Sequence, residues 1–215
     1  AEHTLGILGQ GALEVSYELG GSAFNVMRTL SFFESDLRRG FVGVSGRLGS
    51  SHPHEVLLRE LGVETEFVWA SSALPASSIA FTHAGDRTIL TSHGANSELT
   101  THIQESMGSL ARYLASFSLV HVTSLVDPRA LRFLRDVLGQ AKSQNEGLEV
   151  SIDPGGAWCS EASEDVRDLL RIGSFVHLNE VERDSLGIAG GWQRSPGESA
   201  GWLACPAGTM SSEIS

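Results

Sequence analysis

The sequence predicts an α/β protein in which helices cover both faces of a mostly parallel sheet. Short apolar strands alternate with segments of helical periodicity along most of the chain, which is the pattern of parallel sheets. The length of 215 residues, 41% of them hydrophobic, is enough to bury a core in one domain, or in one domain with a small appendage.

The first elements form a strand and a helix around a pair of glycines. Residues 13–17 alternate apolar and polar side chains, which predicts a strand, and helical spacing follows from Ser22 to about Glu34. The diglycine Gly20-Gly21 lies between them, and Asn25 falls in the first helical turn. Glycines let backbone approach a ligand, and helix-start N–H groups with an amide side chain can bond its oxygens. A tight turn capped by Ser22 explains the same residues without a ligand.

A second strand and helix precede an antiparallel hairpin. Residues 41–44 predict a strand that runs into a turn at Gly46, and a helix follows from 53 to 62. After a strand at 63–69, residues 78–92 predict a hairpin, with 78–83 pairing to 87–92 across a turn that contains glycine. The hairpin interrupts the alternation of strands and helices, so we expect a flap or small second layer beside a site.

The alternation then resumes. We expect helices at 103–114, 131–141 and 166–172, and strands at 119–122, 148–152 and 175–178. Ligands of parallel sheets bind beyond the carboxyl ends of the strands, where Gly46, Asp153 and Asn179 should lie.

The domain is predicted to end near residue 186. Glycine, serine and proline crowd the chain from Gly187 onward without a sustained apolar period. We therefore expect a domain over residues 1–186, with its hairpin region at about 63–92, followed by an irregular tail over 187–215.

Charge and cysteine content limit the classes of partner and compartment. A net charge of −11 without a Lys/Arg cluster argues against nucleic-acid binding. Cys159 and Cys205 lack metal-type spacing and are too few for a disulfide framework, so we expect a reducing, cytoplasmic setting. No apolar run reaches the roughly 18 residues that span a bilayer, so membrane insertion is not expected.

Asn179 and Glu182 stand at the start of a helix, three positions apart on one face. An amide and a carboxylate there can organise a hydrated Mg²⁺ that meets phosphate oxygens. Taken alone, the pair is better explained as an N-cap with an acidic first turn. His52 and His54 face different ways on a helix, which argues against a metal site between them. The pattern G-x-S-x-G at 197–201 leaves a hydrolase only as a remote alternative, because the motif needs a preceding strand and residues 194–196 predict a poor one.

Taken in order, these segments resemble the ribokinase-like (PfkB) family of carbohydrate and nucleoside kinases, over about Leu13 to Leu186. Residues 19–28 are most similar to the adenosine-kinase-like branch. The motifs that carry the resemblance are Gly20-Gly21 with Asn25, Phe41 to Gly46, Gly85-Asp86-Arg87, Gly94-Ala95-Asn96, Asp153-Pro154, and Asn179-x-x-Glu182.

The resemblance implies a three-layer, doubly wound sheet with a small β lid, and ATP-dependent phosphorylation of a hydroxymethyl group on a sugar or nucleoside. The implied cofactors are ATP and Mg²⁺. The implied acceptor-binding residues are Gly20, Gly21, Asn25, Gly46 and Asn96. Asn179 and Glu182 would help to place the nucleotide's phosphate and Mg²⁺, Glu182 acting through water. An exposed lid edge could also pair with a second copy, which makes a homodimer an expectation.

The sequence departs from the family pattern at three places. The strand that usually begins the family's N-terminus and carries an acidic acceptor contact has no convincing counterpart in residues 1–11. Arg47 stands where the family usually has Asp, which puts acceptor contacts of that loop in doubt. The family's Gly-Ala-Gly-Asp run, which opens a helix and supplies the catalytic base, has no counterpart in these 215 residues. The expected fold is therefore incomplete at the C-terminus, and no catalytic residue is identifiable. A non-catalytic module that binds a sugar or nucleoside is the alternative, and the sequence beyond Ser215 would discriminate between the two.

Overall fold

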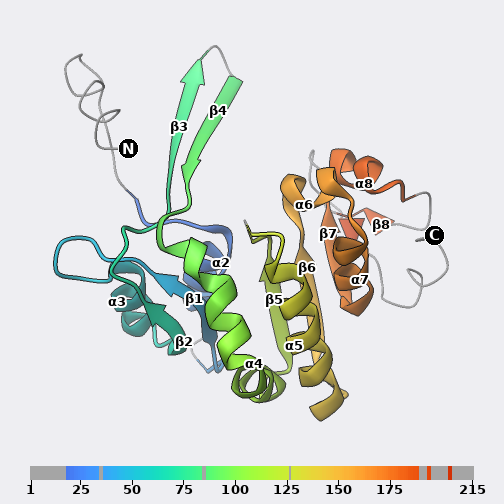
Figure 1. The fold of residues 1–215 in the computed structure, drawn as a ribbon, viewed down its shortest axis with the longest axis horizontal. Coiled ribbons are helices and arrows are strands. Elements are labelled where there is room, and N and C mark those ends of the chain that lie inside the picture. The colour runs from blue at the N-terminus through green and yellow to red at the C-terminus, as the bar shows by residue number, and fades with distance from the viewer. Residues whose placement is uncertain are drawn as a thin grey trace. The chain divides into compact units, whose positions relative to one another are not determined.

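The structure, a computed structural model, describes residues 18–33, 36–83, 86–125, 127–188, 193–194 and 203–204. The chain divides into two compact units, unit 1 over residues 1–97 and unit 2 over residues 98–215 (Figure 1). The strand predicted at 13–17 lies outside the described residues.

Unit 1 contains a parallel strand pair with two helices. Helix α2 spans Ser22–Phe33 and helix α3 spans Pro53–Glu60, while β1 (Gly40–Ser45) pairs in parallel with β2 (Glu64–Ala70). Pro53 occupies the first turn of α3, where its missing N–H costs nothing. Both helices and β2 contribute to one apolar cluster, whose buried members are Phe24, Leu58, Val63 and Val68.

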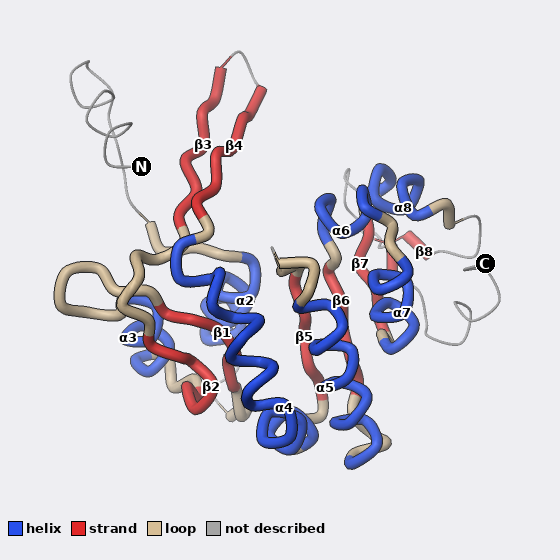
Figure 2. Tube along the Cα trace, viewed as in Figure 1, coloured by secondary structure: helices blue, strands red, loops and turns tan. Residues whose placement is uncertain are grey.

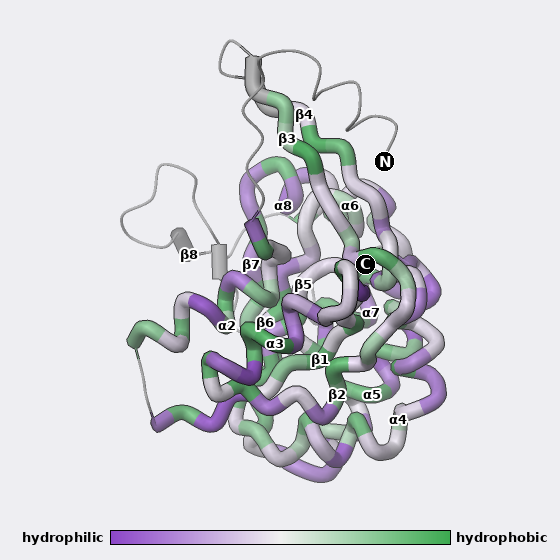
Figure 3. Tube along the Cα trace, turned by 90° about the vertical axis from the view of Figure 1, so that its left-hand side faces the viewer, coloured by the Kyte–Doolittle hydropathy of each residue, from purple (hydrophilic) through white to green (hydrophobic). Residues whose placement is uncertain are grey.

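The predicted hairpin is present in unit 1. Strand β3 (Ser77–His83) pairs antiparallel with β4 (Asp86–Ser92), one residue longer at one end of each strand than expected. The hairpin is shorter than the expected lid region of about 63–92, because the strand at 64–70 pairs with β1 instead. Both strands of the hairpin contain hydrophobic segments (Figure 3).

Unit 2 alternates strands and helices around a mixed sheet. Its described strands follow the order β5-β6-β7-β9-β8; β5, β6 and β7 are parallel, and β9 is antiparallel to both β7 and β8. The strands are β5 (Leu119–Thr123), β6 (Glu149–Asp153), β7 (Phe175–Leu178), β8 (Gln193–Arg194) and β9 (Leu203–Ala204). The helices are α4 (Leu99–Ala115), α5 (Ala130–Gln144), α6 (Gly155–Glu161), α7 (Glu164–Ile172) and α8 (Glu180–Leu186).

One face of the unit 2 sheet forms its core. Val150, Ile152, Val176 and Leu178 alternate along β6 and β7 and are fully buried. Helices α5 and α7 lie side by side over the parallel strands, and their apolar stripes are buried as well (Figure 2). Because side chains alternate along a strand, the opposite face carries the polar residues of the same strands.

These findings confirm the predicted α/β class and most of the predicted elements. Helix α6 differs, because Asp153 to Gly156 was expected to form only a turn. Most of the predicted tail at 187–215 lies outside the described residues, and its described parts include the short strands β8 and β9. Among the described helices, none is long and apolar enough to cross a membrane.

Candidate functional site

The diglycine bend, Gly20-Gly21, leads directly into α2. Gly21 has φ +114°, a backbone conformation that residues with a Cβ rarely adopt. The N–H of Asn25 donates to the carbonyl of Gly21 over 2.9 Å, which closes the first turn of the helix. Asn25 is exposed in that turn, and Ser22 is the first helical residue instead of a cap. The bend therefore leaves an amide side chain accessible at a helix start.

The start of α3 is bonded to the carboxyl end of β1. Ser45, 1% exposed, is the last residue of the strand. Its carbonyl is 2.9 Å from His52 Nδ1, and its hydroxyl accepts from the N–H of Glu55 over 3.4 Å. A few residues along the same helix, His54 Nε2 lies 3.3 Å from the carbonyl of Gly20. Helix α3 thus connects the end of β1 with the diglycine bend.

Three loops pack tightly next to β1. A Cβ added at Gly46 would lie 2.5 Å from the backbone of Pro75, and one at Gly94 would lie 2.4 Å from the carbonyl of Leu74. The N–H of Ala95 also donates to that carbonyl over 2.9 Å. Glycine is therefore required at both positions by close backbone packing.

This packing brings two predicted acceptor residues onto neighbouring loops. The two are Gly46 and Asn96. Asn96 lies two residues after Gly94, in the 3-10 helix Gly94–Glu98, and is exposed. Arg47, at the position where the family usually has Asp, is exposed, and its backbone N–H donates to Ala73. All five predicted acceptor residues belong to unit 1. Their role in binding stays a prediction.

Asn179 and Glu182 form a capping box at the start of α8. The N–H of Glu182 donates to Asn179 Oδ1 over 2.9 Å, and the N–H of Asn179 donates to Glu182 Oε2 over 3.0 Å. This geometry satisfies two helix-start donors and gives the pair a structural role. It supports the N-cap interpretation, while the predicted role with phosphate and Mg²⁺ stays a prediction.

The carboxyl ends of β5 and β6 meet around α6 in unit 2. Gly155 has φ +61°, and a Cβ there would lie 3.0 Å from Ser124 Oγ. The indole N–H of Trp158 donates to the carbonyl of Leu125 over 2.8 Å. Burial, followed by the charges of Glu182 and Asp153, raises the pKa of the Cys159 thiol to about 12. Cys159 is therefore an unreactive buried thiol beside two carboxylates.

The oxygen donors at this end of unit 2 suit Mg²⁺ in kind. Glu182 Oε2 is engaged in the capping box, and Asp153 is a second carboxylate near the same thiol. Within the described residues, no group of three or more His, Cys, Asp or Glu side chains could hold a metal ion. The donor set thus fits a hydrated Mg²⁺ contacted through water better than an ion held in a protein cage.

Sequence reasoning missed a polar cluster on the unit 2 sheet. Ser151 Oγ lies 3.0 Å from His121 Nδ1 and 2.8 Å from His177 Nε2. Burial and the nearby His177 lower the pKa of His121, while Asp153 acts in the opposite direction. The period-two alternation of the three strands signals that these side chains share one face, but the pairing of the strands is needed to bring them together.

The acceptor residues and the pair Asn179–Glu182 belong to different units. Each group is described within its own unit. That both groups frame a single crevice stays a prediction from the sequence.

Comparison with known families gives one match that covers most of the chain. The pfkB family of carbohydrate kinases matches residues 9–189. No curated protein shows significant similarity to the chain.

Several solved structures are similar to this chain. Ribokinase from Giardia lamblia is 21% identical with a TM-score of 0.61, and the match covers 81% of this chain and 56% of that one. Adenosine kinase from Schistosoma mansoni, in complex with 2-fluoroadenosine, is 15% identical with a TM-score of 0.70, over 86% and 54%. Nucleoside kinase from Burkholderia thailandensis, in complex with inosine, is 17% identical with a TM-score of 0.58, over 87% and 58%.

The chain thus spans little more than half the length of these kinases. At identities this low, the likeness establishes the fold alone. The fold is that of the ribokinase-like kinases.

Proposed function

The chain belongs to the pfkB family of carbohydrate kinases, and on that premise we propose that it serves the ATP-dependent phosphorylation of a hydroxymethyl group on a sugar or nucleoside. The observation that carries the proposal is the diglycine bend of unit 1, which opens a helix with an exposed Asn25 in its first turn. A polyol offers hydroxyl groups that both donate and accept. Backbone N–H groups and an amide side chain can satisfy both.

We assign the acceptor contacts to unit 1. Gly20, Gly21 and Asn25 bind acceptor hydroxyls at the bend, and Gly46 and Asn96 contribute from the tightly packed loops beside β1. Support comes from the positive φ of Gly21 and from the absence of room for a Cβ at Gly46. Backbone held this firmly can present donors in a fixed arrangement, which lowers the entropic cost of binding.

We assign the nucleotide side to unit 2. Asn179 and Glu182 help to place phosphate and Mg²⁺, Glu182 through water. ATP with Mg²⁺ supplies the phosphoryl group and neutralises its charge when bound. None of the 215 residues is given the role of catalytic base, because the sequence lacks the Gly-Ala-Gly-Asp run.

The second candidate function is a module that binds a sugar or nucleoside without phosphorylating it. The two functions share the acceptor site and differ in phosphoryl transfer. Incubation of the chain with ATP, Mg²⁺ and an acceptor separates them, because a kinase releases ADP in proportion to phosphorylated acceptor and a binding module does not.

The acceptor site is tested by calorimetry with adenosine, ribose and fructose. We expect one of these ligands to bind, and Asn25→Ala to weaken its binding by about 1–3 kcal/mol, because a ligand hydroxyl then loses its partner. Thr29→Ala is the matched control, since Thr29 lies one turn further along α2 and its hydroxyl donates to the backbone carbonyl of Asn25. Equal affinity of the wild-type and Asn25→Ala proteins would refute this placement of the site.

We further propose that the lid hairpin pairs with a second copy of the chain. Ile79 and Leu90 lie opposite each other, and Phe81 lies two residues along on the same face. Phe81 and Leu90 are exposed. An isolated two-stranded hairpin with an exposed apolar face gains stability when another surface covers it. A cytoplasmic location stays a prediction that rests on the cysteine content and on the family.

A further inference from the structure

His54 connects two segments that are 34 residues apart in the chain. Its Nε2 lies 3.3 Å from the carbonyl oxygen of Gly20, the first glycine of the bend. A carbonyl oxygen only accepts hydrogen bonds, so Nε2 carries the proton and donates. Burial lowers the pKa of His54 more than this bond raises it, so the ring is neutral at pH 7.

The ring of His54 is held in place by its neighbours. It packs edge to face against Phe24 in the first turn of α2, with 4.9 Å between the ring centroids. Phe24 itself is 2% exposed and belongs to the apolar cluster of unit 1. The side chain therefore has a fixed position relative to α2 as well as to its own helix.

The helix that carries His54 is also fixed at its start. Ser45 bonds both His52 and the N–H of Glu55, and Leu58 on the same helix is fully buried in the apolar cluster. These contacts tie α3 to the end of β1. The bond from His54 to Gly20 thus fixes the position of the bend relative to the core of unit 1.

The bond to Gly20 also orients the next backbone donor. The peptide bond between Gly20 and Gly21 is trans, so its carbonyl and its N–H point in opposite directions. With the carbonyl directed at His54, the N–H of Gly21 points away from α3. Two glycines in sequence are otherwise free to rotate this peptide plane, because neither has a Cβ.

We infer that His54 is a positioning residue for acceptor binding: it holds the peptide between Gly20 and Gly21 so that the N–H of Gly21 faces the acceptor's hydroxyl groups. The inference rests on the proposed function of unit 1. It adds a residue that sequence reasoning considered only as a metal ligand.

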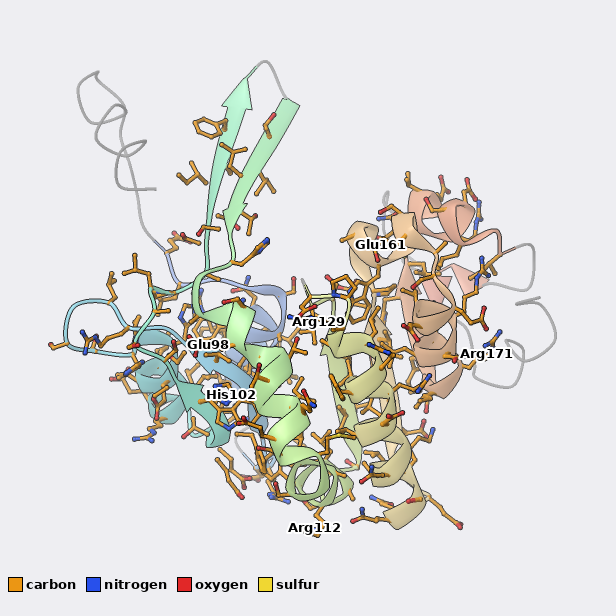
Figure 4. The ribbon with its side chains drawn as sticks, in the orientation of Figure 1. Glu98, His102, Arg112, Arg129, Glu161 and Arg171 are labelled. Carbon is orange, nitrogen blue, oxygen red and sulfur yellow. The ribbon has the colours of Figure 1, made fainter. Side chains whose placement is uncertain are left out.

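The test compares three variants of the full chain by calorimetry and by NMR. His54→Leu removes the donor and retains an apolar side chain of similar length, while His54→Gln restores an amide N–H. His102→Leu is the control, because His102 is also a half-buried helical histidine, located on α4 beside Glu98 (Figure 4). NMR order parameters of the Gly20 and Gly21 amides report the mobility of the bend without any ligand.

We expect His54→Leu to weaken binding of the ligand found among adenosine, ribose and fructose by about three- to tenfold, as for the loss of one hydrogen bond. The order parameters of Gly20 and Gly21 should fall in this variant. His54→Gln should restore both readouts, and His102→Leu should change neither.

Two results would overturn the inference. Unchanged order parameters at the bend in His54→Leu show that His54 does not hold it, whether or not a ligand binds. Unchanged affinity with a loosened bend shows that its orientation does not matter for the acceptor. If the wild-type chain binds none of the three ligands, the proposed function fails, and the order parameters still decide whether His54 fixes the bend.

Discussion

At the scale of single residues, the two glycines of the bend have different conformational requirements. Gly21 has φ +114°, whereas a Cβ added at Gly20 meets no atom within 4 Å and its φ lies outside the region that favours glycine. The second glycine is therefore required by the backbone conformation. The first is not required by either space or φ.

This difference predicts opposite outcomes for two alanine substitutions. Gly21→Ala should lower the free energy of unfolding by about 1–3 kcal/mol, the usual cost of a non-glycine residue in a disfavoured backbone region. Gly20→Ala should change it by less than about 0.5 kcal/mol. Urea denaturation followed by circular dichroism measures both values. Equal destabilisation by the two substitutions would contradict the assigned bend.

The sequence predicted the local features of these residues and missed their long-range contacts. Helical spacing correctly located Asn25 in the first turn, because that depends on neighbours within four residues. The bonds of His52 to Ser45 and of His54 to Gly20 depend on how α3 packs, so no local pattern contains them. The expectation that the two histidines face different ways left their actual partners open.

At the scale of elements, the start of α8 has both a structural and a functional interpretation. The capping box alone explains why Asn179 and Glu182 are three residues apart. A role with Mg²⁺ requires the negative charge of Glu182 in addition. The two interpretations therefore differ in whether charge matters or only hydrogen bonding.

Two substitutions separate these interpretations. Asn179→Ala removes the cap and should lower the free energy of unfolding by about 0.5–2 kcal/mol. Glu182→Gln keeps an oxygen that accepts from the N–H of Asn179, so we expect stability close to the wild type but weaker Mg²⁺-dependent binding of ATP. Calorimetry with ATP in the presence and absence of Mg²⁺ measures this. Unchanged ATP binding in Glu182→Gln would leave the pair with its capping role alone.

The hairpin of β3 and β4 provides a further prediction at this scale. Replacing the exposed Leu90 by Ser should shift the chain from dimer toward monomer, since it removes apolar area from the proposed contact. Sedimentation equilibrium measures the dissociation constant. Phe32→Ser is the control, because Phe32 is exposed on α2, outside the hairpin. A wild-type chain that is monomeric at all concentrations would refute pairing through the lid.

Periodicity located the strand between two helices to the residue but missed a short helix that begins with two glycines. The strand at 175–178 was located to the residue, because four apolar or aromatic positions between helices leave few alternatives. Helix α6 was missed, since Gly155 and Gly156 at its start are typical of a turn. The indole N–H of Trp158 on this helix donates to the carbonyl of Leu125, a contact with a distant residue that no local pattern contains.

At the scale of the whole molecule, titratable groups predict a loss of stability in acid. Burial lowers the pKa values of His54 and His121 in the folded chain. In the unfolded chain both histidines have the ordinary pKa of about 6.5, so at and below that pH the unfolded chain binds more protons than the folded chain. The free energy of unfolding should therefore fall as the pH drops from 7 through this value. Hydrogen bonds from Arg129 lower the pKa of Asp127 to about 2, which adds a second loss between pH 3.8 and that value.

Urea denaturation at pH 7.5, 6.5 and 5.5 tests the histidine part of this prediction. The variant carrying both His54→Gln and His121→Gln should lose less stability over this range than the wild type. A wild-type chain that becomes more stable on acidification, or a variant with the same pH dependence, would contradict the assignment.

The class of fold was predictable from the whole sequence, while its division into units was not. Alternation of strands and helices predicted the α/β class because it reflects which faces each element must bury. The boundary between Ser97 and Glu98 depends on which elements contact each other, and a chain of regularly alternating elements carries no signal for it. The predicted domain over 1–186 stays a prediction, and most of the predicted tail over 187–215 lies outside the described residues.

The central claim is that the diglycine bend of unit 1 binds the acceptor. A crystal structure of the chain with its tightest ligand among adenosine, ribose and fructose tests it most directly. We predict ligand hydroxyl groups within hydrogen-bond distance of the N–H of Gly21 and the side-chain amide of Asn25. A ligand bound elsewhere, with both groups facing solvent, would contradict the claim.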